Sequence, residues 1–136
     1  MARYVGLLDG KAGAYGIVIP DLPGCYGGGA TIDETMRDAI GAAAAWADAA
    51  EQAGEAIPAA RSIEALRKDR EVAAAIAEGA ALVVIPLLRD SGRPAKANIS
   101  MDAGLLTAID EAAAERNLTR SAFLASAARE KIESGR

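Results

Sequence analysis

The sequence predicts an α+β protein in which a larger domain is followed by a small segment that associates with a second copy. Two short strand patterns, at 3–8 and 14–19, flank DGKAG, which suits a hairpin. A continuous apolar run at 80–88 indicates a further strand, and alanine-rich helical patterns lie between and after these strands. We place the larger domain at residues 1–90, a linker at 91–95 and the small segment at 96–136.

The chain between the hairpin and the first long helix is rich in proline and glycine. PDLPGCYGGG (20–29) breaks regular structure, and its end has room for a short third strand near Tyr26. Thr31 and Glu34 then form a capping-box pattern at a helix start. This helix is expected to run from about residue 32 to 53 and to end at Gly54. Its apolar residues recur every three or four positions: Ile32, Met36, Ala39, Ile40, Ala43 and Ala47.

Two further elements complete the larger domain. Ser62 is a suitable N-cap for a helix over residues 63–76. The run AALVVIPLL (80–88) is apolar throughout, which predicts a strand at the centre of a sheet, although Pro86 weakens its end. RDSGRPA (89–95) combines Gly, Ser and Pro with charges and is typical of a linker.

The small segment contains a strand with no partner in its own sequence. KANISM (96–101) alternates polar and apolar residues, and helices are expected over 102–115 and 119–133. So short a segment buries little core alone, and an unpaired strand edge favours association. We therefore predict a homodimer in which the two strands pair antiparallel and four helices close over them. The apolar residues that would face this core are Ala97, Ile99, Met101, Leu105, Leu106, Ile109, Ala113, Phe123, Leu124, Ala127, Ala128 and Ile132.

The polar side of the paired strand suits double-stranded DNA. Lys96, Asn98 and Ser100 from both copies would form a two-stranded ribbon that fits the major groove and reaches base edges. The last helix then begins with a hydroxyl, a guanidinium and free backbone N–H groups, which suit a phosphate. These residues are Thr119, Arg120 and Ser121. Thr119 by itself is also explained by N-capping.

Charge and composition limit the partners and the chemistry. Residues 1–90 hold 8 Lys or Arg and 13 Asp or Glu, whereas residues 91–136 hold 7 and 6. The acidic part therefore suits a basic protein, and the remainder is not repelled by phosphate. The 136 residues include no histidine and one cysteine, so we expect no metal site, no cofactor and no His-dependent catalysis. Without a signal-peptide pattern or a long apolar run, we expect a cytoplasmic protein with no membrane partner.

The proline-rich loop has two interpretations. Its residues, Asp21, Leu22, Pro23, Gly24 and Cys25, form either an interaction loop or a rigid connection fixed by the flanking prolines. We interpret Cys25 as a small buried residue, because no histidine exists to activate its thiol.

Acidic and aromatic residues also invite functional interpretations. Asp9, Asp21 and Asp33 suggest a nuclease carboxylate cluster, but Asp9 suits a hairpin turn and Asp33 the first turn of a helix. Trp46 suits packing better than base stacking, since its surroundings are not basic.

Two stretches of the chain resemble known families. The ribbon-helix-helix repressors are similar to KANISMDAGLLTAIDEAAAERNLTRSAFLASAAREKI in strand alternation, helix lengths and turn position. The HicB antitoxins are similar to the hairpin followed by IPDLPGCYGGGATIDETMRDAIGAA. These resemblances imply a partial RNase H-like sheet with helices, followed by a ribbon-helix-helix domain that dimerises. They also imply that the protein is not an enzyme but neutralises a HicA-like toxin, a small basic mRNA-cleaving protein, and represses its own operon.

Other readings of the sequence remain open. One keeps the DNA-binding segment and makes residues 1–90 a small-molecule-sensing domain of a stand-alone repressor. Another is an RNase H-like enzyme, which the placement of the acidic residues opposes. Pairing of the N-terminal domains in addition to the C-terminal segments would give a tetramer.

Overall fold

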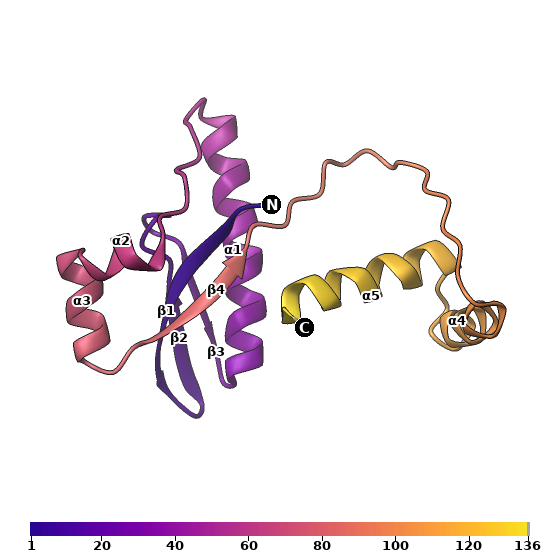
Figure 1. The fold of residues 1–136 in the computed structure, drawn as a ribbon, viewed down its shortest axis with the longest axis horizontal. Coiled ribbons are helices and arrows are strands. Elements are labelled where there is room, and N and C mark those ends of the chain that lie inside the picture. Colours follow the sequence, from indigo (N-terminus) through magenta and orange to yellow (C-terminus); the bar gives the residue numbers. More distant parts are fainter. Residues whose placement is uncertain (136) are drawn as a thin grey trace. The chain divides into compact units, whose positions relative to one another are not determined.

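A four-stranded antiparallel sheet in the order β3-β2-β1-β4 organises the first part of the chain (Figure 1). The computed structural model describes residues 1–135, and they form two units, an N-terminal unit up to Arg89 and a C-terminal unit from Asp90. The predicted α+β class is confirmed. The N-terminal unit contains β1 (Arg3–Lys11), β2 (Ala14–Val18), β3 (Tyr26–Gly29), α1 (Ile32–Gln52), α2 (Ile63–Arg67), α3 (Arg70–Ala77) and β4 (Ala81–Pro86). The C-terminal unit contains α4 (Ala103–Glu115) and α5 (Arg120–Ser134).

The hairpin between β1 and β2 is tighter than predicted. Lys11 pairs with Ala14, so the connection consists only of Ala12 and Gly13. Gly13 has a φ of +91°, which glycine adopts at little cost and which a two-residue hairpin turn requires. Asp9, expected in the turn, lies in β1 instead.

The start of α1 follows the predicted capping box, except that the carboxylate bonds to the residue before the N-cap. The Thr31 hydroxyl accepts the N–H of Glu34 at 3.2 Å, and the Glu34 carboxylate accepts the N–H of Ala30 at 3.1 Å. The helix then lies very close to β3. A Cβ on Gly27 would be 2.7 Å from the backbone of Ala39, so only glycine permits this approach.

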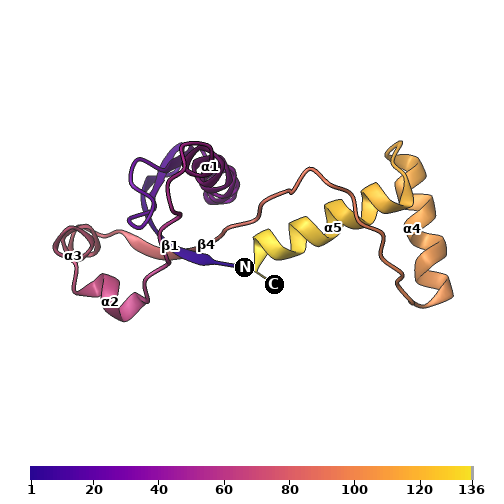
Figure 2. The same cartoon turned by 90° about the horizontal axis from the view of Figure 1, so that it is seen from above.

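The sheet has helices on both faces, as Figures 1 and 2 show. α1 packs on one face, where Tyr4 and Ile17 belong to the main core. The pair α2 and α3 packs on the opposite face against Val5 and Leu7. Because successive strand residues point to opposite faces, neighbouring residues of β1 enter different cores. None of the helices within residues 1–135 is long and apolar enough to span a membrane.

The prediction of a single helix over residues 63–76 is wrong, because the chain forms two helices there, α2 and α3. Asp69 separates them and is the N-cap of α3, since its carboxylate accepts the N–H groups of Glu71 and Val72 at 3.0 and 3.3 Å. A short acidic side chain that bonds to nearby backbone in this way favours a helix start over a helix interior. The break lets Leu66 of α2 and Val72 of α3 enter the same core.

The prediction that residues 80–88 form a central strand is also wrong. β4 pairs only with β1 and lies at the edge of the sheet, while β1 and β2 are the inner strands. Part of the run packs against helices on one face of the sheet or the other, although Val84 is 50% exposed. Ile85 is buried on the α1 face, and Leu82 packs against the core on the opposite face.

The C-terminal unit leaves most of its apolar residues exposed. Ile109 and Ala113 of α4 are buried, but α5 has no buried residue among those described. Ile99 and Leu105 are 65% and 54% exposed. Within residues 1–135, the segment 96–101 forms no strand. A strand requires a hydrogen-bonded neighbour, which a single chain does not supply here.

Candidate interaction sites

The proline-rich loop at 20–25 is largely built into the core. Asp21 is only 8% exposed, and Leu22 and Cys25 are buried in the main core. Pro23 and Gly24 are exposed. Of the five residues predicted to form an interaction loop, only these two are therefore open to a partner. Burial raises the pKa of the Cys25 thiol, which keeps it protonated and unreactive.

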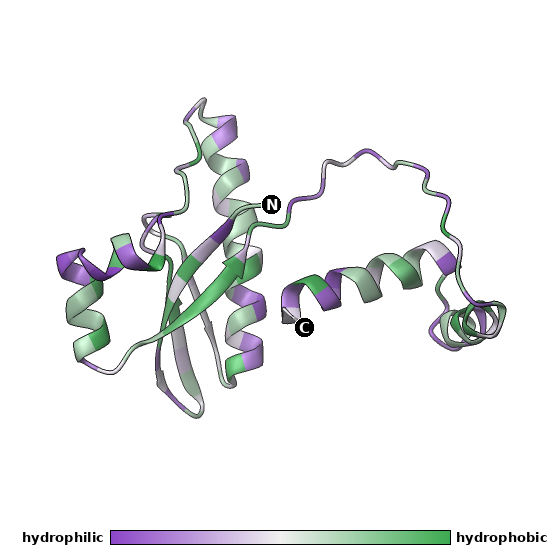
Figure 3. Ribbon diagram, viewed as in Figure 1, coloured by the Kyte–Doolittle hydropathy of each residue, from purple (hydrophilic) through white to green (hydrophobic). Residues whose placement is uncertain are grey.

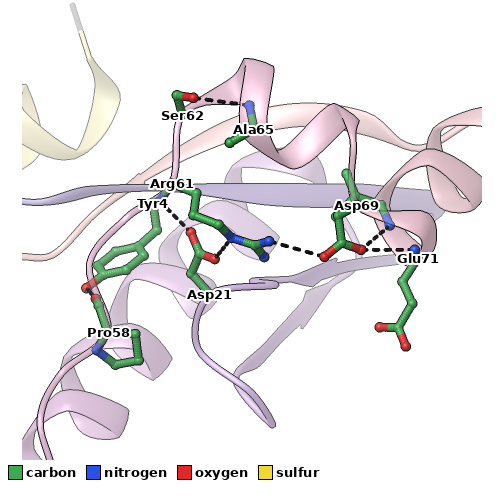
Figure 4. A network of polar contacts seen from close by, with 9 residues as sticks. Tyr4, Asp21, Pro58, Arg61, Ser62, Ala65, Asp69 and Glu71 are labelled. Atoms are coloured by element: carbon green, nitrogen blue, oxygen red, sulfur yellow. Dashed lines mark hydrogen bonds and ion pairs between the residues drawn. The ribbon is translucent and has the colours of Figure 1, made fainter.

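Asp21 is the centre of a polar network that holds the loop in place (Figure 4). One carboxylate oxygen of Asp21 accepts the backbone N–H of Arg61 at 2.7 Å, and the other accepts Nε of Arg61 at 2.6 Å. Arg61 also donates from Nη1 to Asp69 at 3.2 Å. The hydrogen bond from Arg61 lowers the pKa of Asp69. One arginine thus joins the loop, the connection before α2 and the N-cap of α3.

Two aromatic side chains add further connections around the same loop. The Tyr4 hydroxyl donates to the carbonyl of Pro58 at 2.6 Å, and burial followed by the nearby charge of Asp21 raises the pKa of Tyr4. Trp46 of α1 is half-buried against the main core and donates from Nε1 to the carbonyl of Pro23 at 2.9 Å. The exposed tip of the loop is therefore a rigid surface rather than a free loop.

The acidic residues considered as a nuclease cluster have separate structural surroundings. Asp21 is engaged by Arg61, Asp9 lies in β1 and Asp33 lies in the first turn of α1. In residues 1–135, no three His, Cys, Asp or Glu side chains are grouped so that they could hold a metal ion.

The residues predicted to read bases are exposed in the C-terminal unit. Lys96, Asn98 and Ser100 all lie on the solvent-exposed segment before α4. Thr119 is the N-cap of α5, and its hydroxyl accepts the N–H of Ala122 at 3.1 Å. Its capping role is therefore present in the structure, and any phosphate contact would be additional to it.

Arg120 has a partner that the sequence did not indicate. Its Nε and Nη2 atoms donate to the two carboxylate oxygens of Asp110, each at 2.8 Å. This side-chain hydrogen bonding lowers the pKa of Asp110. The pair joins α4 to the start of α5 across ten residues, a separation at which sequence spacing gives no signal. Ser121 follows in the first turn of α5 and is exposed.

Comparison with known proteins covers both units. Residues 4–128 match the family described as HicB_like antitoxin of bacterial toxin-antitoxin system. No curated protein matches the chain. The crystal structure of the Burkholderia pseudomallei antitoxin HicB is similar over 94% of this chain and 96% of its own, at 29% identity and a TM-score of 0.56. The crystal structure of the antitoxin HicB3 is similar over 96% and 97%, at 27% identity and a TM-score of 0.54.

A third structure supports the fold alone. A chain in a HicA3 and HicB3 toxin-antitoxin complex is similar over 65% of this chain and 98% of its own, at 20% identity and a TM-score of 0.52.

Proposed function

Because the chain belongs to the HicB-like antitoxins of bacterial toxin-antitoxin systems, we propose that it neutralises a HicA-type mRNA-cleaving toxin and represses its own operon. The N-terminal unit would bind the toxin, and the C-terminal unit would bind operator DNA as a ribbon-helix-helix dimer. The observation that carries this proposal is the family match over residues 4–128, which includes the sheet, its helices and most of α5.

The toxin-binding part of the proposal rests on charge and on the rigid loop. Residues 1–90 carry an excess of acidic side chains, which attracts a basic protein and speeds its encounter. We place the contact at the loop from Asp21 to Cys25, where Pro23 and Gly24 are exposed and the buried residues hold the backbone in position. A surface that is already ordered loses little conformational entropy on binding.

The DNA-binding part rests on the exposed apolar residues of the C-terminal unit. Pairing of two segments around residues 96–101 would cover Ile99 and give each strand a hydrogen-bonded neighbour. Lys96, Asn98 and Ser100 would then face the major groove. At the start of α5, Asp110 occupies Nε and Nη2 of Arg120, which leaves Nη1 for a phosphate oxygen beside Thr119 and Ser121.

Toxin binding is tested by co-expression with a small basic protein encoded by a neighbouring reading frame. We expect the two proteins to co-purify in equal amounts, and we expect this chain to restore the growth that the basic protein alone prevents. The complex should weaken as salt is raised, because charges contribute to it. Growth arrest that persists despite full expression of this chain would contradict the antitoxin role for that pair.

Operator binding is tested by Asn98→Ala. Asparagine makes a two-point contact with adenine, so the change should cost about 1 to 3 kcal/mol at the cognate site and leave toxin binding intact. A gel-shift titration with the upstream DNA of the operon measures the first effect, and co-purification with the toxin measures the second. The matched control is Gln52→Ala, which removes an amide from the C-terminal end of α1 in the N-terminal unit. Equal operator affinity of Asn98→Ala and the original protein would refute the assignment.

A further inference from the structure

The proline-rich loop is folded by its own backbone into two consecutive turns. The N–H of Leu22 donates to the carbonyl of Ile19 at 3.0 Å, and the N–H of Cys25 donates to the carbonyl of Leu22 at 2.9 Å. Each bond joins residues three apart, which defines a β-turn. The N–H of Ile19 donates to the carbonyl of Cys25 at 3.3 Å and closes the loop. The path of the backbone is therefore fixed up to the exposed tip.

The second turn, from Leu22 to Cys25, is a type II turn. Pro23 is its second residue, and the proline ring holds φ at about −65°. Gly24 is its third residue and has a φ of +83°. A negative φ followed by a positive φ is the type II pattern, in which glycine is the usual third residue. The type I alternative differs by a rotation of the Pro23–Gly24 peptide through roughly half a turn.

Trp46 holds this peptide in the type II orientation. It is the only aromatic residue of α1, an alanine-rich helix whose ribbon is pale green over much of its length in Figure 3. Its Nε1 donates to the carbonyl of Pro23 at 2.9 Å. The Pro23–Gly24 peptide is trans, so its C=O and N–H groups point in opposite directions. Because the carbonyl points to the indole, the N–H of Gly24 points away from it.

Gly24 has free backbone groups in open space. Among residues 1–135, neither its N–H nor its carbonyl has a hydrogen-bond partner, and the residue is exposed. No atom lies within 4 Å of the place that a Cβ on Gly24 would take. The backbone of another protein can therefore approach this N–H closely. An N–H group that is held in one direction is a donor prepared for a partner.

We propose that the N–H of Gly24 donates to a carbonyl oxygen of the toxin, and that Trp46 is a positioning residue for this contact. The proposal rests on the proposed function, which places the toxin at the loop. A carbonyl is the acceptor that every residue of a partner carries. If the Pro23–Gly24 peptide could rotate, only part of the molecules would present the N–H, and the affinity would fall by that fraction. The hydrogen bond from Trp46 prevents this loss by acting through Pro23.

The donor is tested by amide hydrogen exchange, measured by NMR on the full chain alone and in the complex co-purified with the toxin. We expect the Gly24 amide to exchange at least roughly tenfold more slowly in the complex. The Cys25 amide is bonded to Leu22, so it should be protected in both samples and show that the turn persists. A Gly24 amide that exchanges equally fast in both samples would overturn the proposed donor.

The positioning role is tested by Trp46→Phe. Phenylalanine keeps an aromatic ring on α1 but has no donor for the Pro23 carbonyl. We expect the toxin to bind roughly threefold to tenfold more weakly, which is the usual effect of one hydrogen bond. Displacement of the original chain from the co-purified complex by the variant measures the relative affinity.

Tyr4→Phe is the matched control. It also removes one aromatic donor to a proline carbonyl, because the Tyr4 hydroxyl donates to Pro58 at 2.6 Å. Tyr4 is buried, so this variant should unfold at a lower urea concentration than the original chain, yet it should bind the toxin equally well. If the Trp46 bond were merely structural, the two variants would have the same toxin affinity. That result would overturn the positioning role.

Failure of the proposed function gives a different result. If the original chain forms no complex with the toxin, the antitoxin role is contradicted for that pair, and the Gly24 contact with it. A stable complex with a fast Gly24 amide, or with equal affinity of Trp46→Phe and Tyr4→Phe, contradicts only the contact proposed at Gly24 and Trp46.

Discussion

Replacing Asp21 with alanine is expected to lower the free energy of unfolding by about 2 to 4 kcal/mol. Asp21 is buried and accepts two hydrogen bonds from Arg61, one from the backbone N–H and one from Nε. Alanine leaves both donors without their acceptor, and it releases the connection between the loop and the segment before α2. Urea denaturation followed by circular dichroism at neutral pH measures the change.

Two further variants separate the possible causes of this loss. Asp21→Asn retains an oxygen that can accept the N–H of Arg61, so it should recover part of the stability. Asp38→Ala is the matched control, because Asp38 is exposed and accepts a single backbone N–H, from Gly28. It should cost no more than about 1 kcal/mol. If Asp21→Ala is no more destabilising than Asp38→Ala, the buried network does not stabilise the N-terminal unit as argued.

Replacing Ile99 with aspartate is expected to convert the proposed dimer into a monomer. In the proposed dimer Ile99 enters the shared core, and the change places a carboxylate there from each strand. Burying unpaired charges should weaken association by about 3 kcal/mol or more, which is over a hundredfold. Light scattering after size-exclusion chromatography measures the mass, and a gel shift should show loss of operator binding with it.

Ser100→Asp provides the comparison for this variant. Ser100 is adjacent to Ile99 but lies on the opposite side of the alternating segment, so the same carboxylate should remain in solvent. Its mass should stay that of the original protein, although its DNA affinity should fall. Equal masses for the original protein and Ile99→Asp would contradict the proposed dimer core.

The features that sequence predicted correctly are those with a local cause. The capping box at Thr31 and Glu34 and the strand at Tyr26 depend on residues within a few positions of one another. The antitoxin family inferred from the hairpin and residues 19–43 is likewise confirmed by the family match. Asp69 is the N-cap of α3 and a local signal, but the apolar spacing continues across it and favours a single helix.

The features that sequence did not predict depend on the assembled fold. Asp21 and Arg61 are 40 residues apart, and no spacing rule connects them. The sequence does not indicate the edge position of β4, because an apolar run is typical of a central strand, whereas packing against helices on both faces explains part of the same composition. The strand expected at 96–101 depends on a second chain, so it stays a prediction.

The hydrogen bond between Trp46 and Pro23 gives this protein an intrinsic optical signal. Trp46 is the only tryptophan in the chain, so the indole emission comes from one known place. Its Nε1 donates to the carbonyl of Pro23, which with Gly24 forms the exposed tip of the loop. A partner that covers this tip or shifts it would change the polarity around the indole. Fluorescence of the unlabelled protein would then report the arrival of a tryptophan-free partner in real time.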